Sequence, residues 1–464
     1  MIVVERVLGS AFPQVVRVHV RSHDPDFDLP WASTAYEDVG VAVVVGERTL
    51  LCLASLVLDA VPWEQPLGAE QAVARIAAID HDRDLALLEV AGSLEEIWGI
   101  APLELAPLPP AGDVVLLAGY SEDAPEQRQG HAVIGDIGLV RYAHSQRHLL
   151  AATIEARQPF SDGGDAVLRS GKLVGIVMQR ERDEPLRGDV IAPEIIRAFL
   201  AGVERGAPPG VPALGIGFQV PSNPALRASL GLAEHDGGIV VTRVEHGGTC
   251  DGVLEPRDVL AAIDDTPIAE DGTVEYAGRA LRHYAVLCDR SIGERVQLTV
   301  WRRGQVLELE ATLGPLAALV PRVRTGPPEY LVFAGLVLQP LSRDFLRTWE
   351  TWWNNGPKEF LHAYYMGQRT AQQHAIIAIT SILEDPINDG YGDFQNESIV
   401  RVNGTAPRDL RALAAVLDAA TGELVIETST GGLIALDAAE ARAATSRICS
   451  ERQIPADRRL NTVA

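Results

Sequence analysis

The chain has 464 residues, with 40 Lys and Arg against 63 Asp and Glu, so its formal charge is −23. Binding to nucleic acid requires a basic face, and so acidic a chain argues against that partner class. The hydrophobic share of 47% is that of an ordinary globular protein. The length predicts two to four domains.

The cysteine pattern and the N-terminal residues bear on cofactors and location. Cys52, Cys250, Cys288 and Cys449 lie far apart with no Cys-x-x-Cys pair, which predicts neither a zinc site nor a disulfide framework. We expect buried, reduced thiols and no cofactor. The first residues lack the features of a signal peptide, and no apolar run approaches the ~20 residues that span a bilayer. We therefore expect a cytoplasmic protein without a membrane anchor.

Residues 1–203 contain many short runs of Val, Ile and Leu, each bounded by Gly, Pro, Asp or Arg. Such a pattern predicts an all-β barrel or sandwich. The predicted strands in this region include residues 15–20, 41–45, 84–90, 114–118 and 173–178. Pro193 begins an apolar run that predicts one helix near the end of the region.

Segments rich in Gly and Pro divide the rest of the chain. Residues 206–212 and residues 315–328 cannot continue a strand or a helix, so both are predicted to be boundaries. They separate a module at 211–315 from one at 328–464, and the later module repeats the strand pattern of the earlier one in weaker form. Its aromatic segment, 345–366, has no counterpart in the earlier module. We expect that segment to be core, with a ligand platform as the alternative.

Several landmarks, in this order, resemble the HtrA/Deg family of serine proteases. Asp84 opens a strand like the one that begins with the triad aspartate, and 112–119 is similar to the segment after it. The stretch 172–177 follows a Gly-Gly turn like the family's hairpin after the nucleophile, and 330–337 looks most like the second PDZ domain of Deg proteases. The resemblance covers essentially the whole chain.

The resemblance implies a mainly β fold with α+β modules. We expect a trypsin-like domain, a chymotrypsin-like double β-barrel, at 1–203. PDZ domain 1 is expected at 211–315. A PDZ-like domain 2 with a helical, aromatic insertion is expected at 328–464.

The chemistry of this family needs a Ser nucleophile, a His base, an Asp that orients the His, and N–H groups that bind the oxyanion. The resemblance places these triad positions, in the order His, Asp and Ser, at Ser55, Asp84 and Asp162. It also places Phe160, Gly163 and Gly164 in the oxyanion turn. Only Asp84 has the expected type. Because a carboxylate is a poor nucleophile toward an amide and a Ser hydroxyl is no base near neutral pH, we predict a pseudoprotease.

Other residues near the nucleophile turn leave alternatives open. Ser161 could replace the nucleophile, but a one-residue slip turns a side chain to the opposite face of an extended segment. Asp162 and Asp165 could bind a cation, although a solvated loop is the simpler interpretation. In a sharper hypothesis, the Asp162 carboxylate lies against the N–H groups of the oxyanion turn. A base could also come from a histidine elsewhere, although we expect these to be surface or turn residues: His19, His23, His81, His131, His144 and His148.

Two segments resemble the loop with which a PDZ domain holds a peptide's terminal carboxylate while the peptide adds as a strand to a sheet edge. Leu214, Gly215 and Ile216 form the stronger candidate, with an ordinary turn as the alternative. The weaker candidate comprises Ala334, Gly335 and Leu336.

The sequence thus predicts a non-catalytic HtrA/Deg-like scaffold or chaperone-like factor in protein quality control. Its expected partners are polypeptide clients, basic or neutral because of the charge, or an active partner protease. The resemblance further implies a homo-oligomer, such as a trimer. The alternative is an active serine-type endopeptidase with an unorthodox site.

Overall fold

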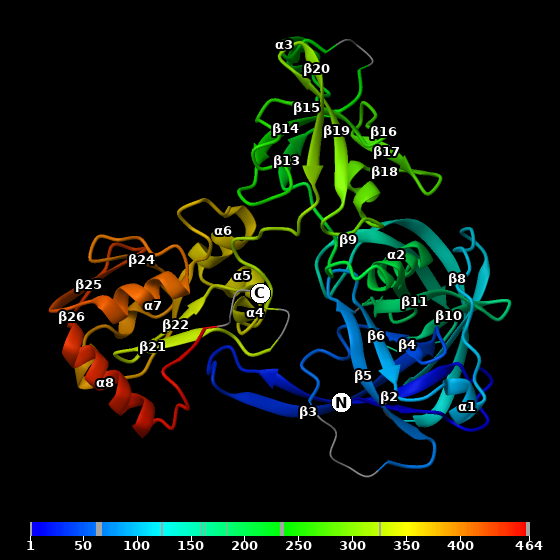
Figure 1. Ribbon diagram of the computed structural model, residues 1–464, viewed down its shortest axis with the longest axis horizontal. Helices are drawn as coiled ribbons and strands as arrows, with labels where there is room; N and C mark the ends of the chain where they lie inside the picture. Colours follow the sequence, from blue (N-terminus) through cyan, green and yellow to red (C-terminus); the bar gives the residue numbers. More distant parts are fainter. Residues whose placement is uncertain are drawn as a thin grey trace. The chain divides into compact units, whose positions relative to one another are not determined.

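The computed structural model describes residues 2–61, 67–121, 124–158, 160–161, 163–181, 183–232, 236–323 and 326–460. The chain divides into two compact units, and Figure 1 labels the helices and strands of both. The first consists of Met1–His23, Ala35–Val244 and Gly248–Leu316, and the second of Asp24–Thr34, Glu245–Gly247 and Ala317–Ala464.

The first unit begins with a closed six-stranded barrel in the order β1-β2-β3-β4-β6-β5. Along β2, buried side chains alternate with partly exposed ones, as expected of a strand with one face toward a core. The apolar interior of this barrel includes Val4, Val18, Leu50 and Leu88. Its strands are β1 (Ile2–Glu5), β2 (Val15–Pro25), β3 (Ser33–Val44), β4 (Thr49–Cys52), β5 (Gln71–Asp80) and β6 (Leu85–Val90), followed by helix α1 (Leu94–Trp98).

A second closed barrel follows, in the order β10-β11-β12-β9-β8-β7. Helix α2 starts with a proline in its first turn and turns Ile195, Ile196 and Phe199 inward. These residues join a core that includes Leu51 and Leu85 of the first barrel and Ile176 of the second, so apolar packing joins the barrels. The elements are β7 (Val114–Ser121), β8 (Ala124–Arg141), β9 (His148–Ala156), β10 (Ala166–Arg169), β11 (Lys172–Arg180), β12 (Arg187–Ile191) and α2 (Pro193–Glu204).

Residues 211–244 and 248–315 of the first unit are here called the middle module. Its main sheet runs β13-β14-β15-β19-β20, so β13 is an edge strand, and β17 and β18 form a separate hairpin. Its elements are β13 (Ile216–Gln219), α3 (Pro224–Leu230), β14 (Ile239–Val244), β15 (Val259–Ile263), β16 (Thr266–Pro267), β17 (Thr273–Tyr276), β18 (Arg279–Arg282), the 3₁₀ helix η1 (His283–Leu287), β19 (Arg295–Arg302) and β20 (Gln305–Thr312).

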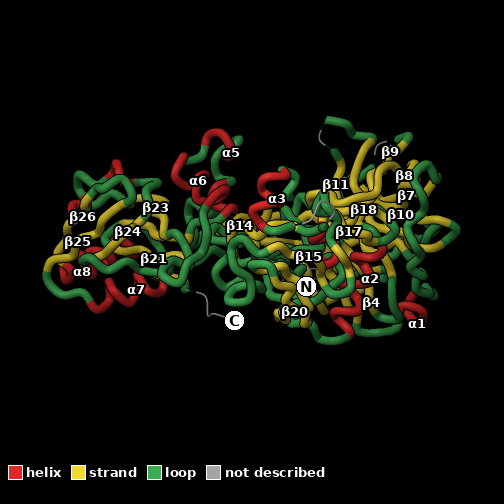
Figure 2. Tube along the Cα trace, turned by 90° about the horizontal axis from the view of Figure 1, so that it is seen from above, coloured by secondary structure: helices red, strands yellow, loops and turns green. Residues whose placement is uncertain are grey.

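The second unit contains two sheets, β23-β22-β21-β27 and β24-β25-β26. Helices α7 and α8 run along these strands (Figure 2), and each begins at an aspartate, Asp409 or Asp437, whose side chain accepts backbone N–H groups. The strands of this unit are β21 (Tyr330–Phe333), β22 (Leu336–Pro340), β23 (Ile377–Ile382), β24 (Ile399–Val402), β25 (Glu423–Thr428), β26 (Leu433–Asp437) and β27 (Arg458–Arg459). Its helices are α4 (Arg343–Leu346), α5 (Trp352–Asn355), α6 (Lys358–Met366), η2 (Pro386–Asn388), η3 (Gly392–Phe394), α7 (Leu410–Ala419) and α8 (Ala438–Glu451).

Several sequence expectations can be compared with this fold. The predicted double barrel is confirmed. All four cysteines are buried and free. The aromatic segment 345–366 is only partly core, since Phe345 and Phe360 are buried whereas Trp353 is 50% exposed. Within the described residues, no helix is long and apolar enough to cross a membrane.

The predicted boundary at 206–212 is packed against the first barrel at its end and is not a loose linker. It lies between α2 and β13 as expected, but its end, from Gly210 to Pro212, is buried. The backbone N–H groups of Gly210 and Val211 donate to Asp80 and Asp82 of the first barrel. The composition of the segment predicted the break in secondary structure correctly, but it carried no information about this packing.

Candidate active and peptide-binding sites

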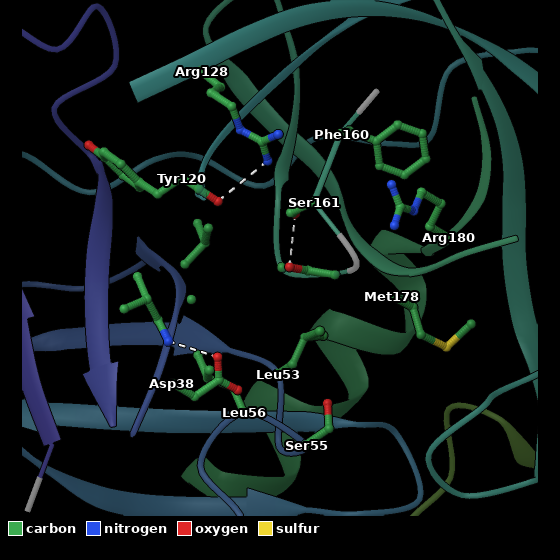
Figure 3. Close-up of a pocket in the computed structure, with 15 residues that line it drawn as sticks. Asp38, Leu53, Ser55, Leu56, Tyr120, Arg128, Phe160, Ser161, Met178 and Arg180 are labelled. Carbon is green, nitrogen blue, oxygen red and sulfur yellow. Dashed lines mark hydrogen bonds between the residues drawn. The ribbon is translucent and has the colours of Figure 1, made fainter. Parts of the chain in front are cut away.

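A cavity of about 540 Å³ lies against residues of both barrels (Figure 3). Its volume is in the range typical of ligand sites. Polar and charged side chains contribute to it together with apolar ones, so its wall is chemically mixed. The lining residues include Asp38, Leu53, Ser55, Leu56, Tyr120, Arg128, Phe160, Ser161, Gly163, Gly164, Met178 and Arg180.

Ser55 occupies a well-defined place beside Asp84. The Ser55 backbone N–H donates to Asp84 Oδ1 at 2.7 Å, and the Ser55 hydroxyl donates to Oδ2 at 3.2 Å. Asp84 is 1% exposed and has a left-handed backbone with φ of 54°, a conformation that is uncommon outside glycine. The structure therefore brings these two predicted site residues together, with the carboxylate oriented toward residue 55.

The glycine pair after the predicted nucleophile position is required by close packing. A Cβ atom at Gly163 would lie 2.9 Å from the carbonyl oxygen of Met178 and 3.0 Å from the Leu53 side chain. Gly164 has φ of 93°, where glycine is favoured. Asp162 itself lies outside the described residues, so the hypothesis about its carboxylate and the oxyanion turn stays a prediction.

Ser161 and Asp165 form a contact that the sequence analysis missed. The Ser161 hydroxyl lies 2.6 Å from Asp165 Oδ1 and 3.0 Å from the Gly163 carbonyl oxygen, and the Ser161 N–H donates to Asp165 Oδ2 at 3.2 Å. Both carboxylate oxygens thus hold residue 161. The expectation of a solvated Asp165 was wrong, since this side chain is buried. The only sequence signal was a Ser and an Asp flanking the glycine pair.

The charge of Asp165 is influenced by opposing effects. Burial raises the pKa of its carboxyl, while the hydrogen bonds from Ser161 and the Arg128 guanidinium, 4.0 Å away, act in the other direction. Among the described residues, no group of three His, Cys, Asp or Glu side chains is placed to hold a metal ion.

The histidines are the remaining candidates for a base at this cavity. None of them is among its described lining residues. His81 and His144 lie in turns, as expected, but both are buried, with His81 Nδ1 3.2 Å from His144 Nε2. Burial of these two rings among polar neighbours could not be inferred from their isolated positions in the sequence.

The loop before β13 has the features needed to bind a carboxylate. Gly215 has φ of 68°, and its hypothetical Cβ would lie 3.0 Å from Gly248 Cα, so a glycine is required there. Among the described residues, neither Leu214 nor Gly215 donates its backbone N–H to an acceptor. Because β13 is an edge strand, its outer side can accept a further strand beside this loop.

Helix η1 lies beside this edge strand. The ring of His283, the first residue of η1, meets Phe218 of β13 edge-on, with centroids 4.5 Å apart. His283 is 2% exposed, and its Nδ1 has no hydrogen-bond partner among the described residues. Burial, and secondly the Arg282 guanidinium, lower the pKa of His283 from its ordinary 6.5 to about 4.

The second predicted carboxylate loop has a different environment. Ala334 and Gly335 both have positive φ and form the tight turn between β21 and β22. The Ala334 N–H donates to Thr445 Oγ1 at 2.8 Å. Leu336 belongs to β22, which is paired on both sides. This turn therefore offers no open sheet edge, which argues against peptide binding there.

The burial of a neutral His283 makes stability depend on pH. Since its pKa is about 4 in the fold and about 6.5 when exposed, the unfolded chain takes up the proton first as the pH falls. The contribution of neutral His283 to the free energy of unfolding is complete above about pH 6.5. It decreases by up to about 3 kcal/mol as the pH falls to about 4. The protection factors of the η1 amides, which are corrected for the pH dependence of the intrinsic exchange rate, should therefore decrease over this range.

Replacing His283 should remove this part of the pH dependence. We expect the protection factors of the η1 amides to vary less with pH in His283→Phe than in the wild type. His131→Gln, at an exposed position, should retain the wild-type dependence on pH. Identical profiles for wild type and His283→Phe would contradict the assignment.

Comparison with known proteins agrees with this architecture. Residues 321–460 match the model of a PDZ domain family. The chain is 29% identical over 461 residues to Protease Do-like 2, chloroplastic, of Arabidopsis thaliana, covering 97% of this chain and 75% of that protein. It is 27% identical over 459 residues to Protease Do-like 4, mitochondrial, of the same plant, covering 97% and 85%.

A solved structure supports the fold. A variant of the HtrA-type protease AlgW with a decapeptide matches with a TM-score of 0.51 and 21% identity, covering 65% of this chain and 94% of that chain. With relatives that extend over nearly its whole length, a PDZ match at its C-terminal end and two closed six-stranded barrels, the chain is similar in sequence and in fold to the Deg/HtrA proteases.

Proposed function

We propose that the protein is a catalytically inactive member of this family that binds polypeptides as a scaffold or chaperone-like factor. The observation that carries the proposal is the pair of hydrogen bonds from Ser55 to Asp84. A hydroxyl group stands where the family's resemblance implies an imidazole. It cannot accept a proton near neutral pH, so the Asp84 carboxylate has no base to orient.

The middle module supports the binding part of the proposal. We assign it as a PDZ domain, because its edge strand β13 follows an apolar-Gly-apolar loop whose Leu214 and Gly215 N–H groups have no acceptor among the described residues. Such a site takes an extended peptide by strand addition, with the terminal carboxylate on the loop. The AlgW structure was obtained with a decapeptide. We therefore expect the client to be a polypeptide with a free C-terminus.

A second candidate function is a serine-type endopeptidase with an unorthodox site. The observation that favours it is the 2.6 Å contact between the Ser161 hydroxyl and the buried Asp165 carboxylate. A carboxylate with a raised pKa is a better base than an ordinary one, but still far weaker than a serine alkoxide. The second oxygen of Asp165 also fixes the Ser161 N–H, so we assign this contact to holding the turn.

The partner, the assembly and the location of the protein are further predictions that accompany this proposal. An active protease of the same family is a candidate partner, and a homo-oligomer, such as a trimer, remains a prediction. A cytoplasmic location also remains a prediction, since the relatives are named as chloroplastic or mitochondrial proteins.

Restoring the triad tests whether the site lacks only the catalytic side chains or has also lost the geometry that catalysis needs. We expect the wild type to leave casein intact. The double variant Ser55→His plus Asp162→Ser should cleave it slowly, because Asp84 is already oriented toward residue 55. The single variant Ser55→His is the matched control and should remain inactive. Casein cleavage by the wild type that disappears on Asp84→Ala would overturn the proposal.

Peptide binding can be tested at the loop before β13. A fluorescein-labelled neutral decapeptide ending in Val-Val-Leu with a free carboxylate should bind the wild type in an anisotropy titration. Its C-terminal amide should bind roughly tenfold more weakly, since a charged hydrogen-bonded group is lost. We also expect an acidic version of the peptide to bind more weakly, because the chain carries a charge of −23.

Two glycines provide a matched pair for the same titration. Gly215→Ala should weaken binding, since its Cβ would approach Gly248 Cα to 3.0 Å and displace the loop. Gly252→Ala carries a similar backbone penalty, with φ of 75°, but its Cβ meets nothing within 4 Å, so it should bind like wild type. Equal affinity of Gly215→Ala and wild type would contradict the assignment of this loop.

A further inference from the structure

The connection between β5 and β6 is unusual in being both charged and buried. Together with Asp80, the last residue of β5, it comprises His81, Asp82, Arg83 and Asp84, and all five side chains are buried. Asp84 is the residue that holds Ser55 in the cavity. Burying several charges in one short connection is costly unless they are paired, so their partners identify what this segment does.

Arg83 contacts three parts of the first unit at once. Its guanidinium donates to Asp80 Oδ2 at 2.6 Å within its own connection, and to the carbonyl oxygen of Gly210 at 3.0 Å in the segment after α2. It also donates to the carbonyl oxygens of Cys288 at 3.2 Å and Arg290 at 2.8 Å. These last two residues form the turn that follows η1. The planar fork of an arginine suits this geometry.

Asp80 and Asp82 also bind the segment after α2. These contacts and those of Arg83 are together called the junction. Asp80 Oδ2 accepts the N–H of Gly210 at 3.1 Å, and Asp82 Oδ2 accepts the N–H of Val211 at 3.0 Å. Gly210 has φ of 111°, and a Cβ there would lie 3.2 Å from Asp82 Oδ2. Backbone donors and acceptors of the segment after α2 are therefore satisfied by side chains of the first barrel.

Helix η1 lies between the turn that Arg83 holds and the edge strand β13. It ends immediately before Cys288, and its first residue, His283, packs against Phe218 of β13. The position of η1 is thus fixed at its end by Arg83 and at its start by contact with β13. A residue of the first barrel thereby sets the position of an element that flanks the strand where a peptide would add.

We propose that Arg83 is a positioning residue for peptide binding by the middle module: it holds the turn after η1, and so keeps η1 at the distance from β13 that an added strand requires. This inference rests on the proposed peptide binding at β13. It extends that proposal, because it assigns a role in client affinity to a barrel residue adjacent to Asp84.

The variant Arg83→Lys tests the role. A lysine keeps the charge beside Asp80, but its single ammonium group cannot reach both the Gly210 carbonyl and the carbonyls of the turn after η1. We expect affinity for the decapeptide to fall roughly tenfold, as for the loss of one or two hydrogen bonds. Amide hydrogen exchange of residues 283–290 should also accelerate. Arg75→Lys, which alters the ion pair between Arg75 on β5 and Glu89 on β6, is the matched control and should change neither readout.

The two readouts separate the failure of this inference from that of the proposed function. If the wild type binds the peptide and folded Arg83→Lys matches it in affinity and in exchange, the inference is wrong while the peptide site stands. If the wild type does not bind the peptide, the proposed function fails, and unchanged exchange at residues 283–290 would reject the positioning role as well. Should Arg83→Lys not fold, Gly210→Ala disturbs the same junction at Asp82 and should shift both readouts in the same direction.

Discussion

The carboxylate of Asp84 fixes the geometry on which the rest of the site depends. It is buried in the core between the barrels, its backbone adopts a left-handed conformation, and both of its oxygens are used by residue 55. In the resembling proteases this is the arrangement that orients a base. Here the group that Asp84 holds is Ser55, through its N–H and its hydroxyl, so the carboxylate has a structural role in the site.

The remainder of the cavity follows from close packing. Gly163 leaves room for the Met178 carbonyl and the Leu53 side chain. Asp165 occupies space that Gly119 leaves free, and holds the N–H and the hydroxyl of Ser161. A buried aspartate beside a glycine turn thus maintains the shape of the turn by hydrogen bonding.

Much of the fold was predictable because the sequence pattern of a strand is recognisable within a few residues. The runs around Val41 and Val115 read as strands, and Pro193 marked the start of a helix, since alternation and turn chemistry act over a few residues. The pairing of Ser55 with Asp84 was predictable only through the order of family landmarks. The roles of Asp165 and Arg83 were not, because they depend on contacts between segments distant in the sequence, which no local pattern encodes.

The central claim is that no serine in this cavity is activated, and covalent labelling measures this directly. A fluorophosphonate probe reacts with activated serine hydroxyls and requires neither a peptide substrate nor turnover. After incubation at neutral pH beside an active serine protease as the positive control, the intact mass of this protein should be unchanged. A stoichiometric adduct that peptide mapping places on Ser161 or Ser55 would contradict the account.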